Sequence, residues 1–241
     1  MVKWYWSIAT PVRSRFPYNR MMNNHYVIDL SHEIESGMIT HPGLPAPMIC
    51  DFLTREDSAS RYTNGTEFHI GRIDMVANTG TYIDSPFHRF AHGDDISQLP
   101  LALLVNLPCC VIRVAERARR AITASDFGDA DVTGKAVLIH TGWDAFWGQD
   151  AYLSDNPHLT EDAANFLVEN GAILVGIDSV NIDSLNDSAR PVHTILLGHR
   201  IPIVEHMCNL GAITGEVRFF AAPVAVRGMG TFPTRAYAIR E

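Results

Sequence analysis

The sequence predicts an α/β fold in a single domain, and three observations lead to this prediction. The chain has 241 residues, of which 46% are hydrophobic and 19% charged, and a chain of this kind can bury one large core. A strand, a helix and a second strand follow one another within residues 135–178. No repeat, low-complexity tract or long linker divides the chain.

The strand–helix–strand unit is the clearest local pattern. The run "KAVLIHTGW" is typical of a buried strand that ends in a turn, and "AILVGID" is typical of a second buried strand. Between them, Thr160 is expected to cap a helix whose first turn carries Glu161 and Asp162, where the helix dipole favours acidic side chains. Gly171 stands where a glycine commonly follows a helix. This spacing predicts a parallel, right-handed crossover.

The ends of these two strands are a candidate position for a functional site, because ligands of parallel sheets bind where strands end. This places Trp143 and Asp178 near the site. Core packing is an equal alternative for Trp143, since large aromatic side chains dominate cores regardless of function. The sequence contains no Gly-x-Gly-x-x-Gly, phosphate-loop or Gly-x-Ser-x-Gly pattern, so dinucleotide, nucleotide and serine-hydrolase functions lack support.

Shorter elements are expected before this unit. Residues 26–34, "YVIDLSHEI", alternate in a manner typical of a strand. Residues 66–80, "TEFHIGRIDMVANTG", predict a strand that runs into a turn-rich motif. Residues 118–129, "ARRAITASDFGD", predict a short helical piece capped by Ser125 or Asp126.

The chain ends and the charge bear on partners and location. Residues 1–24 are expected to be a loosely attached extension of a domain over residues 25–241; the alternative is an ordered arm that covers a neighbouring subunit. The net charge of −8, with no basic block, argues against nucleic acid or an anionic membrane as a partner. No apolar run approaches the roughly 20 residues that span a bilayer. The four cysteines show no Cys-x-x-Cys spacing, which favours a reducing cytoplasm.

The motif "NTGTYIDSPFH", residues 78–88, carries the chemistry. Asp84 and His88 offer a carboxylate oxygen and an imidazole nitrogen, both of which zinc or manganese accepts. His193 and Glu205 could join them, because each lies in an apolar run where an unpaired charge is costly. Taken singly, each is better explained as a hydrogen-bonded core residue. Together the four have the composition of a catalytic metal site.

The motif resembles the signature of the cyclase family of metal-dependent hydrolases, the kynurenine-formamidase-like enzymes, which reads His-x-Gly-Thr-His-x-Asp-x-Pro-x-His. Further similarity follows in order along the chain, in "DLSHEI", "HTGW", "GIDSVNID", "HTILLG", "IVEHMCNL" and "FPTRAYAI". The resemblance implies a central mixed sheet or barrel-like core flanked by helices. It also implies assembly as a homodimer or homotetramer.

The resemblance also implies roles for single residues. It places three side chains at the ligands of one ion: Asp84, His193 and Glu205. His88 matches the residue that transfers protons. Asn78 and Tyr82 stand at two positions where the family signature has histidine, and neither a neutral amide nor a phenol with a pKa of about 10 replaces an imidazole. In two-metal members of the family these histidines hold a second ion. One divalent ion, zinc or manganese, is therefore expected here in place of two.

These observations predict an arylformamidase-like hydrolase of a small amide, cyclic imide or lactone. The ion would lower the pKa of a bound water to about 7, and His88 would carry the proton to the leaving group. His41 and Trp143 are expected to frame the substrate. Two alternatives stay open: a metal-free acid/base lyase or isomerase, and a small-ligand-binding protein that has lost hydrolase activity.

Overall fold

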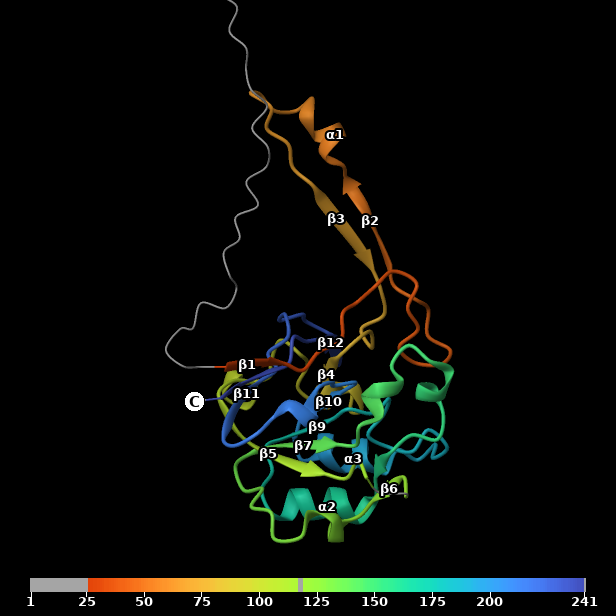
Figure 1. Cartoon of the computed structure of the whole chain (residues 1–241), viewed down its shortest axis with the longest axis vertical. Helices are drawn as coiled ribbons and strands as arrows, with labels where there is room; N and C mark the ends of the chain where they lie inside the picture. The colour runs from red at the N-terminus through yellow and green to blue at the C-terminus, as the bar shows by residue number, and fades with distance from the viewer. Residues whose placement is uncertain (1–25, 117–118, 241) are drawn as a thin grey trace, which may run out of the picture.

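The central feature of the fold is a mixed sheet of nine strands that curls into half of a barrel (Figure 1). The computed structural model describes residues 26–116 and 119–240. The strands, in their order across the sheet, are β1 (Tyr26–Asp29), β13 (Tyr237–Arg240), β11 (Val217–Phe220), β5 (Leu107–Arg113), β7 (Ala136–His140), β9 (Leu174–Ile177), β10 (Ile203–Glu205), β4 (Tyr82–Asp84) and β12 (Thr231–Pro233). The four strands from β5 to β10 are parallel and their neighbours on both sides are antiparallel. The predicted mixed α/β fold is confirmed.

The predicted strand–helix–strand unit is present as β7, the helix α2 (Glu161–Glu169) and β9. The two strands are parallel, with Ala136 paired with Leu174. Thr160 stands at the N-cap, although its hydroxyl donates to the Ile122 carbonyl oxygen at 3.0 Å and does not cap a backbone N–H of the helix. Gly171 follows the C-cap with a φ of 73°, a conformation that favours glycine.

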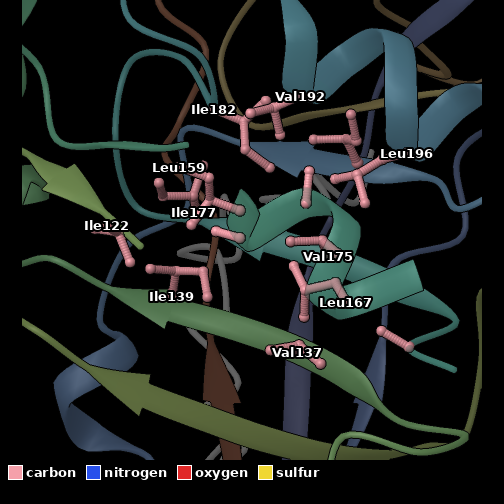
Figure 2. Packing of buried hydrophobic residues seen from close by; sticks show 14 of the residues in the cluster. Ile122, Val137, Ile139, Leu159, Leu167, Val175, Ile177, Ile182, Val192 and Leu196 are labelled. Carbon is pink, nitrogen blue, oxygen red and sulfur yellow. The ribbon is translucent and has the colours of Figure 1, made fainter. Parts of the chain in front are cut away.

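Buried apolar side chains cover both faces of the sheet, as the continuous apolar runs of parallel strands require. Val137 and Ile139 point to one face and pack against α2 and the helix α3 (Pro191–Gly198), as Figure 2 shows. Ala136 and Leu138 point to the opposite face and join a second cluster. This alternation follows from the two-residue period of a strand. As a result, β7 contributes side chains to both hydrophobic clusters.

An arm projects from this body (Figure 1). It consists of a separate antiparallel hairpin, β2 (Met48–Leu53) and β3 (Ile70–Asp74), with the helix α1 (Arg55–Ala59) between its strands. The strand expected in residues 66–80 therefore ends earlier than predicted. The chain leaves the arm after Asp74 and turns at Gly80, whose φ is 66°, before β4 begins.

Short elements complete the described chain. They are β6 (Ala121–Ile122), β8 (His158–Leu159) and the 3₁₀ helices η1 (Pro86–His88), η2 (Leu101–Leu103), η3 (Ala124–Phe127), η4 (Trp143–Phe146), η5 (Asp150–Leu153) and η6 (Leu210–Ala212). The predicted cap of η3 is wrong: Thr123 is the N-cap, and Asp126 sits three residues later and accepts from the Thr123 N–H at 2.7 Å.

Two expectations concern the chain as a whole. The extension over residues 1–24 lies outside the described residues, so the domain boundary stays a prediction. Within residues 26–116 and 119–240, every helix is too short or too polar to cross a bilayer.

Candidate active site

Four elements that are far apart in the sequence supply the site. Asp84 ends β4, His88 ends the 3₁₀ turn that follows, His193 lies in the first turn of α3, and Glu205 ends β10. Strands β4 and β10 are antiparallel neighbours, so the cross-strand partner of Glu205 is Tyr82. The sheet order thus brings the motif at residues 78–88 against the later acid and imidazole.

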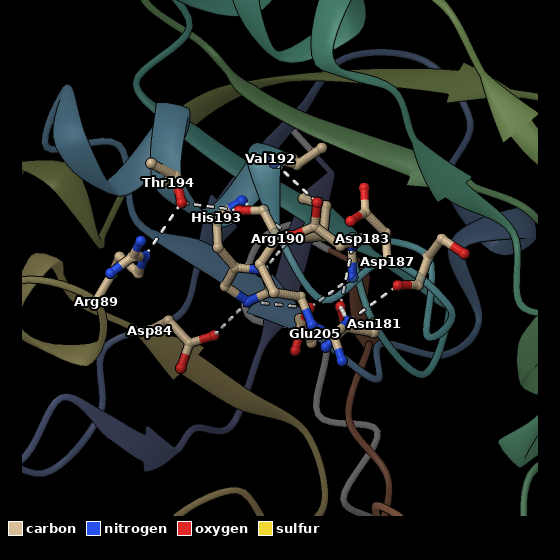
Figure 3. Close-up of polar contacts among 12 residues, drawn as sticks. Asp84, Arg89, Asn181, Asp183, Asp187, Arg190, Val192, His193, Thr194 and Glu205 are labelled. Atoms are coloured by element: carbon tan, nitrogen blue, oxygen red, sulfur yellow. Dashed lines mark hydrogen bonds and ion pairs between the residues drawn. The ribbon is translucent and has the colours of Figure 1, made fainter.

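The His193 side chain lies between two carboxylates (Figure 3). Its Nε2 atom is 3.6 Å from Asp84 Oδ2 and 3.6 Å from Glu205 Oε1, both longer than hydrogen bonds. Two ligand atoms about 2.1 Å from one ion at a tetrahedral angle lie about 3.4 Å apart, which matches this spacing. Asp84 Oδ2 is also fully buried and has no hydrogen-bond partner among the residues that the structure describes. These three residues fit a divalent ion.

His88 lies close enough to take part as well. One ligand atom each from Asp84, His88 and His193 lie within 4.8 Å of one another. Glu205 is outside this group of three, although it flanks His193. Asp84 and His193 belong to both possible sets of ligands, so the third ligand of an ion is either His88 or Glu205.

Asp183 orients His193, and the sequence analysis did not single it out. Its carboxylate accepts from His193 Nδ1 at 2.6 Å and from the backbone N–H groups of Val192 and His193. A histidine whose Nδ1 is held by a carboxylate presents Nε2 to a metal, a common arrangement around zinc. The signal available was the position of Asp183 in "GIDSVNID", ten residues before His193.

Three buried carboxylates, those of Asp84, Asp183 and Glu205, surround the His193 imidazole. Burial raises the pKa of Glu205 to about 7, with Asp84 adding to the effect. Burial lowers the pKa of His193, but the charge of Glu205 and the hydrogen bond to Asp183 outweigh it and raise the pKa to about 10. In the absence of an ion, a protonated His193 balances part of this carboxylate charge; a divalent cation at Nε2 would take the place of that proton and balance more of it.

Tyr82 occupies one of the positions where the family signature has histidine. Its ring is fully buried, and its hydroxyl donates to Glu205 Oε2 at 2.6 Å. Burial and the neighbouring acids raise the pKa of this phenol well above its usual value, so it remains a neutral donor. The other carboxylate oxygen, Oε1, accepts from the Ile182 N–H at 2.6 Å. Tyr82 thus fixes the Glu205 carboxylate.

A hydrogen-bond chain determines the tautomer of His88. The Thr231 hydroxyl donates to Asp84 Oδ1, which can only accept when ionised. The same hydroxyl lies 2.8 Å from His88 Nδ1. Because a hydroxyl has one proton, Thr231 must accept from Nδ1–H, and this leaves His88 Nε2 as the unprotonated nitrogen of the neutral ring.

A cavity of about 320 Å³ opens over these residues. Six of the residues selected from the sequence line it: His41, Asn78, Tyr82, His88, His193 and Glu205. The lining also includes Leu44, Arg89, Asn181 and Arg190, which the sequence analysis did not select. The size suits one small cyclic molecule.

Trp143 and Asp178 lie elsewhere. Trp143 packs in a buried cluster with Tyr152 and Val180, and its Nε1–H donates to the Tyr152 carbonyl oxygen at 3.1 Å. Trp143 is not among the residues that line this cavity, and its role beside the substrate stays a prediction. Asp178 accepts from the Thr141 hydroxyl and ties the ends of β7 and β9 together.

Comparison with known proteins identifies the family. A family model described as "Putative cyclase" matches residues 28–184. The chain belongs to the cyclase family. Among its relatives, the "Kynurenine formamidase" of Bacillus mycoides (strain KBAB4) is 28% identical over 210 residues, which cover 87% of this chain and 95% of that protein.

Two solved structures agree with this cyclase-family assignment. A structure described as "The Structure Of Potential Metal-Dependent Hydrolase With Cyclase Activity" superposes with a TM-score of 0.74 and 27% identity, covering 90% of this chain and 99% of that one. "Isatin hydrolase A (IHA) from Ralstonia solanacearum" superposes with a TM-score of 0.76 and 20% identity over 90% and 93% of the two chains, which shows a common fold. The resemblance stated from the motif is confirmed.

Proposed function

We propose that this protein is a metal-dependent hydrolase of a small amide, similar to the arylformamidases. The observation that carries the proposal is the His193 Nε2 atom, 3.6 Å from each of two buried carboxylate oxygens, one of which has no hydrogen-bond partner. The relative named kynurenine formamidase supports an aryl formamide as the substrate, with cyclic imides and lactones as further candidates.

One ion fits the chain better than two. Asp84, His193 and Glu205 would hold it, and when bound it would supply an activated water at neutral pH and polarise the carbonyl. Asn78 and Tyr82 offer no imidazole for a second ion, and the Tyr82 hydroxyl is already bonded to Glu205. The donor set, two carboxylates and one imidazole, suits zinc or manganese.

His88 is the proposed proton carrier. Its Nδ1 is held by Thr231, so Nε2 is the free nitrogen, and the residue lines the cavity. It would take a proton from the attacking water and deliver it to the leaving nitrogen. Tyr82 and Ile182 keep the Glu205 carboxylate in place meanwhile.

Metal content and hydrolysis together test the proposal. Protein purified without chelator is expected to contain about one divalent ion per chain by elemental analysis, and to hydrolyse an aryl formamide faster after zinc or manganese is added. Glu205→Gln is expected to reduce the bound metal while circular dichroism stays unchanged. A folded wild-type protein without metal, active at the same rate with chelator present, would instead support the metal-free lyase or isomerase.

We also propose that the protein forms a homo-oligomer through the β2–β3 arm. Apolar side chains stand on both faces of this hairpin and are exposed, among them Ile49, Phe52 and Ile73. A lone two-stranded hairpin is marginally stable in water, and neither face of this one has a core to pack against within the described residues. Its charges are of both signs, which favours a second copy of the chain over nucleic acid or an anionic membrane. The cytoplasmic location stays a prediction.

A further inference from the structure

Two arginines line the cavity. Arg89 directly follows His88, and Arg190 directly precedes α3. Among residues 26–116 and 119–240, no aspartate or glutamate forms an ion pair with either of them. In a chain with a net charge of −8, two unpaired guanidinium groups at one cavity point to a ligand that pairs with them.

Neutral partners hold both guanidinium groups in position. Arg190 Nη1 donates to Asn181 Oδ1 at 2.9 Å and to the Ser184 carbonyl oxygen at 3.2 Å, while Arg89 Nε donates to the Thr194 hydroxyl at 3.1 Å (Figure 3). These bonds use a few of the five N–H donors that each guanidinium carries. The remaining N–H donors are therefore held in place for a ligand. The partners that hold them are neutral, so each guanidinium keeps its full positive charge.

The backbone of Arg190 supports the same conclusion. Its φ of 49° lies in the left-handed region, which a long side chain rarely adopts, and the next residue is a proline. Such a conformation is found where the surrounding structure requires it, commonly at a binding site. Here it accompanies a side chain that lines the cavity beside His193.

Electrostatics determines what kind of group these arginines suit. Glu205 lines the cavity, and the Asp84 carboxylate is buried behind it, 3.6 Å from His193 Nε2; both carboxylates repel an anion when they are ionised. A neutral amide needs no cation to enter, whereas a substrate with its own carboxylate needs a counter-charge. Guanidinium groups bind carboxylates through paired, charge-assisted hydrogen bonds.

We propose that the cavity selects amide substrates that carry a carboxylate, which Arg190 binds with help from Arg89 while the amide carbonyl faces His193 and His88. This proposal rests on the amide hydrolase function proposed above. Leu44 offers an apolar surface to the ring or chain that joins the two groups. Hydrolysis would then release a doubly functional product, an amine or acid that keeps the bound carboxylate.

Matched substrates test the charge requirement. The metal-loaded protein is assayed with 2-formamidobenzoate, its neutral methyl ester and formanilide. We expect kcat/KM to be at least about tenfold higher for the carboxylate than for the ester, the factor that corresponds to 1.4 kcal/mol. Equal values for the acid and the ester, with formanilide hydrolysed in a metal-dependent way, would overturn the carboxylate site and leave the hydrolase function standing.

Variants identify the residue. Arg190→Gln is expected to raise KM for 2-formamidobenzoate about tenfold or more and to bring the ratio of kcat/KM between the acid and the ester close to one, while Arg190→Lys recovers part of the ratio. Arg240→Gln, which removes the same charge on β13 away from the cavity, serves as the control. A loss that is equal for acid and ester would assign Arg190 to general packing and overturn the proposal.

Binding decides the matter if no amide is hydrolysed. Calorimetric titration compares anthranilate with anthranilamide, which differ only in the charged group. Tighter binding of anthranilate to the wild type, lost in Arg190→Gln, supports the carboxylate site although the hydrolase function has failed. Equal affinities, or an anthranilate preference retained by Arg190→Gln, contradict it.

Discussion

Single atoms decide most of the chemistry of this site. His193 presents Nε2 to two acids because Asp183 holds its Nδ1, and His88 has a free Nε2 because Thr231 has one proton and gives it to Asp84. Neither choice of nitrogen is visible in the residue types. Both follow from counting donors and acceptors around buried groups.

The role of Thr231 can be tested directly. Thr231→Val keeps the shape of the side chain but removes the hydroxyl that joins Asp84 to His88. We expect kcat to fall about 10- to 100-fold, the range for partners that orient catalytic or metal-binding groups, with metal content unchanged. Thr231→Ser should stay within a few fold of the wild type. An active Thr231→Val variant would show that His88 needs no such support.

The two substituted signature positions give a second prediction. Asn78→His combined with Tyr82→His supplies two imidazoles beside Asp84, so bound metal should rise by about one ion per chain in elemental analysis. Each single variant should gain much less. Tyr82→Phe leaves Glu205 Oε2 without its donor and should cost about 1–3 kcal/mol in the free energy of unfolding. No gain of metal in the double variant would mean that Tyr82 has become a fixed part of the pocket.

Secondary-structure elements are joined by side-chain hydrogen bonds as well as by apolar packing. Strands β7 and β9 end side by side, and the Asp178 carboxylate accepts from Thr141 N at 2.7 Å, from its hydroxyl at 2.6 Å and from Gly142 N at 2.9 Å. These bonds close the turn after β7. The sequence analysis placed Asp178 near a ligand site, whereas its contacts assign it to holding the crossover.

Asp178 should contribute to the pH dependence of stability. Burial raises its pKa from 3.8 to about 7, in spite of the three donors and with Asp144 adding to the effect. Between these values the folded protein retains a proton that the unfolded chain releases, so this contribution is complete below pH 3.8 and is lost as the pH rises to about 7.

Urea unfolding checks this prediction. Measured at pH 4.5 and 7.5, the wild type should lose more stability between the two than Asp178→Asn, which cannot titrate. The substitution itself should also lower the free energy of unfolding by about 1–3 kcal/mol at both pH values, because the amide that it introduces turns an N–H donor toward backbone N–H groups. This cost does not depend on pH and is separate from the effect of titration. Parallel pH profiles for the two proteins would assign the wild-type dependence to other groups.

The whole molecule consists of a half-barrel body and one projecting arm (Figure 1). Most buried apolar residues of the body pack on one of the two faces of the sheet, while several apolar side chains of the arm are exposed. Phe52 is 71% exposed and Ile73 is 57% exposed. The homo-oligomer proposed above would cover these exposed side chains.

Oligomeric state tests this explanation. Sedimentation or light scattering should find the wild type as a dimer or tetramer, and Phe52→Ser with Ile73→Ser should shift it toward monomer. Leu101→Ser with Val224→Ser is the matched control, because these two side chains are 65% and 68% exposed outside the arm. A monomeric wild type, or equal behaviour of the two double variants, would contradict an interface on the arm.

The sequence by itself determined the local pieces of this protein: the crossover from β7 through α2 to β9, and the motif at residues 78–88. Apolar periodicity, helix caps and a dense group of turn residues are short-range signals, which the chain carries without reference to its fold. Only the tertiary structure decided which residues meet. The order β9–β10–β4 brings Glu205 opposite Tyr82, α3 and its N-cap residue add His193 and Arg190, and Trp143 is left in a separate core. Contacts between distant segments depend on the register of strands across the whole sheet, and no local pattern encodes that register.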